Sequence, residues 1–246
     1  MSVTGCVPGP ALMRRDGKGS ATAAPECVKD TAIPFEAICF MKALSRMRML
    51  LCAAVFLLVV TAVRWNARAA DFSAFDYFQP CTLSTSGLGL SDTVVNFPLL
   101  VRLREQDHKE LFRSASTDGH DIRFSKSDGN TPLYNEMERW DLSAQDSVAE
   151  FWVLMDTIAP NEDRRFLIHF GNSDSSTDRS NAAQVFDTAN GFAGVWHFAP
   201  SDTFGDATGN GYDGTNQGST AFTDGSPIGH GRDFDGDNDY IDVAGF

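Results

Sequence analysis

The stretch DIRFSKSDGNTPLYNEMERWD, residues 121–141, decides the fold class of this 246-residue chain. Ile122 and Phe124 lie in an extended pattern, and the turn-forming residues Ser-Asp-Gly-Asn follow at 127–130. A second extended pattern runs from Leu133 to Trp140. Asp, Gly and Asn between two such segments are typical of a β-hairpin. The sequence therefore predicts two antiparallel strands here.

Further strand patterns occur on both sides of this hairpin, at 94–103, 148–160 and 164–172. The first of these, VVNFPLLVRL, alternates so that Leu99, Val101 and Leu103 share one face, and Pro98 indicates an edge or strand-entry position. Short helical patterns occur only at 107–115 and 180–187. We therefore expect an all-β fold, with a jelly-roll-like β-sandwich domain over residues 70–188.

The N-terminal third has a different character. Residues 49–63 are an apolar run preceded by basic residues and followed by Ala-Arg-Ala at 67–69, the layout of a secretory signal peptide. The run is shorter than the ~20 residues that span a bilayer, although an uncleaved anchor stays an alternative. We expect a non-structural extension over 1–40 and a signal helix over 41–69, cleaved after about Ala69. The protein is then exported to the periplasm, outer surface or extracellular space, and contacts the membrane only through this segment.

Removing residues 1–69 makes the remainder strongly acidic. The whole chain has 20 Lys and Arg and 33 Asp and Glu; the first 69 residues hold 9 and 4, which leaves 20 − 9 = 11 basic and 33 − 4 = 29 acidic residues. This charge repels phosphate backbones, so nucleic acid is not an expected partner. Cys81 is then the only cysteine, which predicts neither a disulfide framework nor a thiolate metal site.

A polar, turn-rich stretch at 171–181 separates this domain from a second module over 189–246. The second module has a predicted strand around Val195-Trp196-His197-Phe198, a long Gly- and Asp-rich loop, and a closing hairpin around residues 231–243. Its 57 residues from 190 onward are fewer than the ~100 that a sandwich usually needs. We expect a truncated domain.

Several motifs in order resemble the bacterial family called domain of unknown function 2341, over about residues 72–188. They are NFPLLVRL, GHDIRFSKSDGNTPLYNEMERWD, AEFWVLMDTI and RFLIHFGN. The last departs from the family, which more often has paired tyrosines where this chain has His169 and Phe170. The residues after 188 resemble the opening strands of a laminin-G-like or concanavalin-A-like sandwich, the usual next module. The resemblance implies an exported envelope protein, sometimes joined to a proton-channel component of biopolymer transport, without an established activity.

The stretch GRDFDGDNDYIDV, residues 231–243, places Asp at every second position from 233 to 239. An EF-hand starting at Asp233 needs Gly at its sixth position and Glu at its twelfth, where the chain has Asn238 and Ala244. Two interpretations stay open: a structural turn between strands, or a calcium site. The candidate calcium ligands are Asp235, Asp237, Asn238 and Asp239.

Glu136 and Glu138 are two residues apart on a predicted strand and should share one face, with Trp140 next on that side. Such a face is a solvated strand surface, a sugar-binding platform, or the carboxyl pair of a glycosidase. Trp196 and Tyr240 are further candidate ligand-binding residues, since sugars stack on aromatic rings. No Gly-x-Ser-x-Gly motif and no phosphate-binding glycine loop occurs.

These observations favour a non-catalytic binding or adhesion module at the cell envelope that recognises a polysaccharide or glycoprotein, with calcium as a candidate assisting ion. One alternative is a structural component of an energised envelope complex for biopolymer transport. Another is a glycan-active hydrolase.

Overall fold

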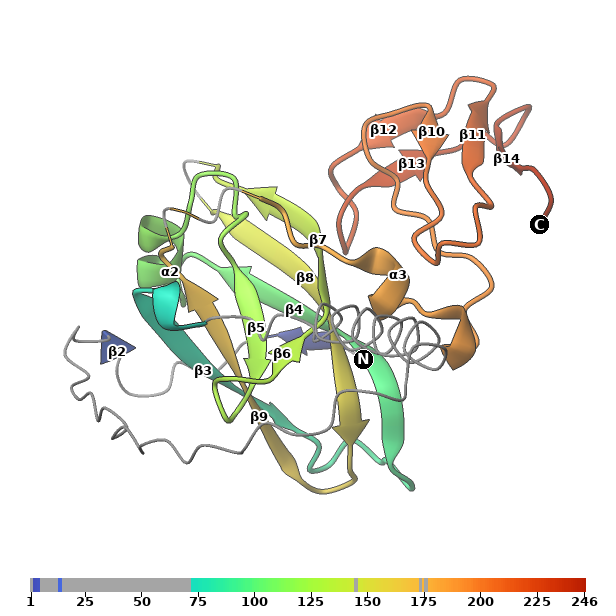
Figure 1. The fold of residues 1–246 in the computed structure, drawn as a ribbon. Helices are drawn as coiled ribbons and strands as arrows, with labels where there is room; N and C mark the ends of the chain where they lie inside the picture. Colours follow the sequence, from blue (N-terminus) through green and yellow to red (C-terminus); the bar gives the residue numbers. More distant parts are fainter. Residues whose placement is uncertain (1, 5–12, 15–71, 144–145, 173, 175–176) are drawn as a thin grey trace, which may run out of the picture. The chain divides into compact units, whose positions relative to one another are not determined.

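The computed structural model describes residues 2–4, 13–14, 72–143, 146–172, 174 and 177–246. Strands dominate, and two sheets pack face to face between residues 77 and 170 (Figure 1). We name them after their central strands. The β8 sheet has the order β1-β4-β8-β7, and the β9 sheet has the order β2-β3-β9-β5-β6. This arrangement confirms the predicted all-β sandwich.

The β8 sheet is built on two long strands. Strand β4 (Val94–Arg104) pairs antiparallel with β8 (Val148–Ile158), and β7 (Asn135–Asp141) pairs antiparallel with the other side of β8. Strand β1 (Ser2–Thr4) runs parallel to β4 beside residues 100–102. Pro98 precedes that pairing, which agrees with its predicted edge position.

The β9 sheet contains the predicted hairpin. Strands β5 (Arg123–Lys126) and β6 (Pro132–Leu133) pair across the 127–130 turn. Strand β9 (Asp163–Phe170) pairs with β5 and with β3 (Tyr77–Ser84), which in turn pairs with β2 (Met13–Arg14). The second hairpin segment is not one strand, because the chain leaves the β9 sheet after Leu133 and enters the β8 sheet at Asn135.

Apolar side chains from both sheets form the sandwich core. Residues such as Leu99, Phe124, Phe151, Phe166 and Ile168 are almost completely buried there. The alternation in β4 places Leu99, Val101 and Leu103 in this core, as predicted. Burying such large side chains is the main favourable contribution to folding.

The short predicted helices are present. Helix α2 (Lys109–Ser114) and helix α3 (Ala182–Val185) fall within the predicted segments, and the single-turn helices η1 (Phe72–Ala74) and η2 (Thr188–Asn190) are additional. Val185 and Phe186 pack with Trp152 and Leu154 of β8. Helix α3 therefore covers part of the β8 sheet on the face opposite the sandwich core.

Residues beyond 190 form small sheets. Strands β10 (Thr203–Phe204), β11 (Gly214–Gln217) and β14 (Tyr240–Val243) make one, and β12 (Ala221–Thr223) and β13 (Gly231–Asp233) make another. The predicted closing hairpin is wrong, because β13 pairs with β12 and β14 pairs with β11. The predicted strand around Val195 to Phe198 is reduced to one bridge between Trp196 and Asp206.

Two expectations depend on the removal of residues 1–69. Cys81 is completely buried and disulfide-bonded; the expectation that it is the only cysteine applies to the chain without residues 1–69 and stays a prediction. The predicted signal helix over 41–69 lies outside the described residues. Within the part of the chain that the structure describes, no helix is long and apolar enough to cross a membrane.

Candidate functional site

Strand β7 carries Glu136 and Glu138, and a β-bulge at Glu138 determines on which face of the β8 sheet the neighbouring side chains lie. Met137 lies opposite Phe151 while Arg139 lies opposite Glu150, so Glu138 has no direct partner on β8. A bulge adds one residue and reverses the alternation after it. Glu136 lies opposite Trp152, on the face away from the core, whereas Trp140 lies opposite the buried Ala149.

Trp140 therefore does not share a face with the two glutamates, and this part of the prediction is wrong. Its ring stacks on Phe112 with centroids 5.4 Å apart and packs against the sandwich core. Its Nε1 donates a hydrogen bond of 3.1 Å to the carbonyl of Thr117. The bulge at Glu138 is the cause, because a regular strand would keep residues 136, 138 and 140 on one side.

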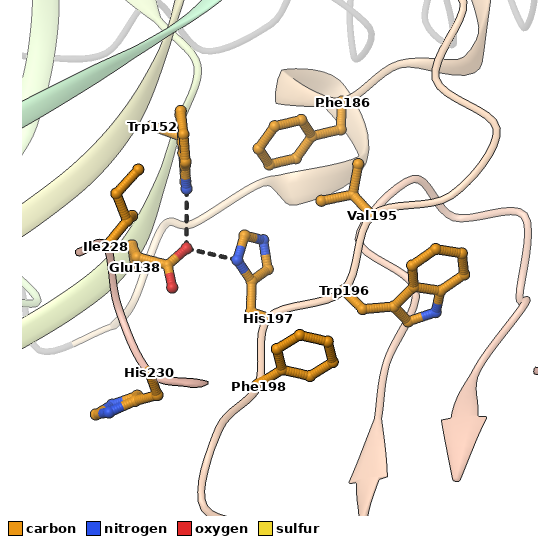
Figure 2. A pocket seen from close by; sticks show the side chains of 9 residues that line it. All are labelled: Glu138, Trp152, Phe186, Val195, Trp196, His197, Phe198, Ile228 and His230. Carbon is orange, nitrogen blue, oxygen red and sulfur yellow. Dashed lines mark hydrogen bonds and ion pairs between the residues drawn. The ribbon is translucent and has the colours of Figure 1, made fainter. Parts of the chain in front are cut away.

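Glu136 and Glu138 share one partner, His197, and we call these three residues the acid–imidazole cluster. His197 Nδ1 lies 2.5 Å from Glu138 Oε2, and His197 Nε2 lies 3.1 Å from Glu136 Oε2. The same Glu138 oxygen accepts a hydrogen bond of 2.8 Å from Nε1 of Trp152 (Figure 2). The exposed fractions of the Glu136 and Glu138 side chains are 14% and 5%. Glu138 is thus held by Trp152 and His197, whereas Glu136 Oε2 has only the contact with His197 Nε2 and no hydrogen bond. Both carboxylates lie in a mostly buried place.

The cluster shifts the protonation equilibria of its members. Burial of His197 opposes its charged form, but the hydrogen bonds and negative charges of Glu136 and Glu138 outweigh this and raise the pKa of His197 to about 10. Burial also opposes the charged form of Glu138, yet His197 and Trp152 lower the pKa of Glu138 below its usual value. At neutral pH the cluster therefore contains an imidazolium.

A second charged group crosses the same face of the β8 sheet. Arg102 on β4, Glu150 on β8 and Arg139 on β7 lie directly opposite one another in neighbouring strands. Arg102 Nε is 2.5 Å from Glu150 Oε1, and Arg139 Nε is 3.3 Å from Glu150 Oε2. Glu150 is completely buried, and burying a carboxylate is costly unless basic partners lie beside it. We call this set the Arg–Glu–Arg row.

The loop between β12 and β13, residues 224–230, docks on this row through its main chain. The amide of Gly229 donates a hydrogen bond of 2.8 Å to Glu150 Oε2. Arg102 Nη2 donates to the carbonyl of Pro227, and Arg139 Nη1 donates to the carbonyl of Gly229 over 3.4 Å. Gly229 has a φ of +54°, and a Cβ built on it would overlap Glu138 Oε1. Only glycine fits this close approach.

Two hollows adjoin the docked loop, and both include Glu138 and His230 in their walls. The Trp196 hollow, of about 310 Å³, is rich in aromatic rings (Figure 2). Its other lining residues are Trp152, Phe186, Val195, Trp196, His197, Phe198 and Ile228. The Trp140 hollow, of about 650 Å³, is more polar. Its other lining residues are Thr117, Asp118, Met137, Arg139, Trp140, Asp141, Leu142 and Asp224.

The structure thus brings four of the predicted ligand-binding residues to neighbouring places. Glu138 and Trp196 line the Trp196 hollow, Trp140 lines the other, and Glu136 contacts His197, which lines the Trp196 hollow. Tyr240 lies apart on β14, lines neither hollow and is 57% exposed. The indole of Trp196 is fixed, since Nε1 donates to the carbonyl of Tyr212 over 2.6 Å.

The aspartate ladder lies between β13 and β14, where its carboxylates accept main-chain hydrogen bonds. Asp239 accepts from the amides of Ser219 and Asp235, and Asp235 accepts from the amide of Asp237. These contacts are those of a turn with Asp side chains that bond the local backbone. Among the described residues, no group of three or more His, Cys, Asp or Glu side chains is arranged to hold a metal ion. Calcium binding by Asp235, Asp237, Asn238 and Asp239 stays a prediction.

Three important residues were not predicted as site residues: Trp152, Glu150 and His197. The segment AEFWVLM contained a signal for Glu150, because a Glu in an apolar strand is rarely buried without a partner. His197 lies in the segment that was predicted to be a strand around Val195 to Phe198. Its partners are about 60 residues earlier in the chain, and no local pattern identifies contacts at that separation.

Comparison with known proteins gives one match. Residues 118–223 match the family described as Domain of unknown function (DUF2341). The matched stretch includes β7, β8, α3 and the bridge at Trp196, and it continues past residue 188. The comparisons with curated proteins and with solved structures gave no match.

Proposed function

We propose a function from the geometry, since the family matched by residues 118–223 has no assigned function. The protein is a non-catalytic module that binds a polysaccharide or the glycan of a glycoprotein at the cell envelope. The supporting observation is the pair of adjoining hollows that share Glu138 and His230. Their volumes fall within the range of about 300–1,000 Å³ that is usual for ligand pockets. Rings of Trp196 and Trp152 in one, and Asp and Arg side chains in the other, suit the apolar faces and hydroxyl groups of sugars.

The protonation states of the acid–imidazole cluster support binding over cleavage. A glycosidase needs a carboxylic acid whose pKa is raised, so that it can protonate the leaving group. The pKa of Glu138 is lowered instead, and the raised pKa of His197 removes it as a base at neutral pH. Both glutamates also have one carboxylate oxygen directed at the His197 ring.

The proposal is tested by titrating the full-length protein with soluble cellulose, chitin, xylan and mannan oligomers, followed by calorimetry. Each titration is run with calcium and with a chelator, which also tests the predicted calcium dependence. We expect saturable binding of at least one oligomer class and no release of reducing ends. Absence of binding to all four classes contradicts glycan recognition, and cleavage of any oligomer contradicts the non-catalytic assignment.

Replacing Trp196 by Ala is expected to weaken oligomer binding about tenfold, because a lost ring contact of ~1.4 kcal/mol corresponds to that change in Kd. The matched control is Tyr134→Ala, which removes an exposed aromatic side chain that lines neither hollow. The control should bind as the unchanged protein does. Equal weakening by both substitutions would place the ligand elsewhere on the surface.

A further inference from the structure

The loop 224–230, which lines both hollows, has the properties of a segment that can open locally. It has no regular secondary structure, and four of its seven residues are exposed, whereas Gly229 is buried. Its docking contacts on the Arg–Glu–Arg row are made by main-chain atoms of Pro227 and Gly229. Such a segment, with few buried apolar contacts, opens at a lower free energy than the strands beneath it.

The loop also stands where the two hollows meet. Ile228 lines the Trp196 hollow, Asp224 lines the Trp140 hollow, and His230 lines both. Gly229 lies against Glu138, which both hollows share. The hydrogen-bond contact of 2.9 Å between His230 Nδ1 and Asp224 Oδ1 joins the two ends of the loop. The loop can therefore leave the sheet as one piece, with its ends anchored in β12 and β13.

We propose that loop 224–230 is a strap that closes over the face of the β8 sheet, and that Glu150 is its latch. When the strap is docked, the Gly229 amide completes the hydrogen bonding of the buried Glu150 carboxylate. When it opens, water replaces that amide, and the hollows join across Glu138 into one groove. An extended sugar polymer then enters along the groove, and a short one fits either hollow. Only this role in ligand entry rests on the proposed function; the opening rests on contacts within the chain.

Amide hydrogen exchange measured by NMR on the unmodified protein tests the strap. The reference is the amide of Leu154 in β8, whose hydrogen bond to the carbonyl of Tyr134 is 2.9 Å long, close to the 2.8 Å bond of Gly229. We expect Gly229 to exchange ~100-fold faster than Leu154, with a weak dependence on denaturant that indicates local opening. Equal exchange with equal denaturant dependence would show that Gly229 opens only by global unfolding, and would overturn the proposal.

A pair of variants in the same loop gives a second test. Gly229→Ala places a methyl group against Glu138 and should prevent docking, whereas the control Gly225→Ala meets only the Thr223 hydroxyl at 3.3 Å. We expect Gly229→Ala to increase exchange over residues 224–230 by at least about tenfold while β8 is unchanged. Unchanged exchange in that loop, or the same increase in Gly225→Ala, would overturn the proposal. Oligomer titrations of the same proteins report separately on glycan binding, so failure of the proposed function leaves the strap result intact.

Discussion

Replacing Glu150 by Ala is expected to lower the free energy of unfolding by about 3 kcal/mol, the lower end of the usual loss when one partner of a buried ion pair is removed. The substitution leaves two guanidinium groups, those of Arg102 and Arg139, without their carboxylate on a mostly buried face. Their side chains are 16% and 18% exposed, so water reaches them only in part. The amide of Gly229 also loses its acceptor. Thermal unfolding should shift downward by about 6–12 °C for a domain of this size.

The matched control lies on the same strand. Asp156 also stands between two basic side chains, Lys126 and Arg164, each with a contact of 2.7 Å, but it is 40% exposed. Asp156→Asn should cost less than about 1 kcal/mol, because water screens exposed ion pairs. Equal losses of unfolding free energy in Glu150→Ala and Asp156→Asn would contradict the prediction that burial makes the Arg–Glu–Arg row more costly to disrupt than an exposed ion pair. Chemical denaturation of both variants measures the comparison directly.

The sequence was sufficient for the sandwich because its signals are local. The alternation in β4 and the Ser-Asp-Gly-Asn turn before β6 each involve neighbours in the chain, and both predictions are confirmed. The prediction of a hairpin at 231–243 is wrong for the opposite reason. Turn-forming residues permit the chain to reverse direction, but they do not require the strands on either side to pair with each other. Here β13 pairs with β12, and β14 pairs with β11. Such pairing depends on packing across the sheet more than on local preference.

The site was only partly predictable. The two glutamates were recognised as sharing a face, but the bulge that places Trp140 on the other face has no glycine or proline to indicate it. The partner that the two glutamates share, His197, comes from a segment without regular strand structure. The acid–imidazole cluster therefore depends on tertiary contacts between distant segments, which local sequence patterns do not define.

Replacing His197 by Gln is expected to cost about 3 kcal/mol at pH 7, because Glu136 and Glu138 then face each other without a cation in a mostly buried place. The difference from the unchanged protein should depend on pH in a defined way. The folded state raises the pKa of His197 to about 10, above the ordinary value of 6.5. Its stabilising contribution is thus complete below pH 6.5 and disappears as the pH rises to about 10. The free energy of unfolding should fall by up to ~1.4 kcal/mol per pH unit in that window.

Below about pH 5 the stabilising contribution of the cluster decreases as the pH falls, because Glu138 becomes protonated. The folded state lowers the pKa of Glu138, so its contribution is present above the usual value of 4.5 and disappears as the pH falls through the lowered pKa. The stability difference between the unchanged protein and His197→Gln should therefore be largest between about pH 5 and 6.5 and decrease on both sides. His120→Gln is the matched control, since His120 pairs with Asp118 at 3.1 Å but with 30% and 50% exposure. Denaturant unfolding of the three proteins from pH 4 to 10 decides the matter: a difference that does not change with pH would mean that His197 stabilises the cluster by packing and not by its charge.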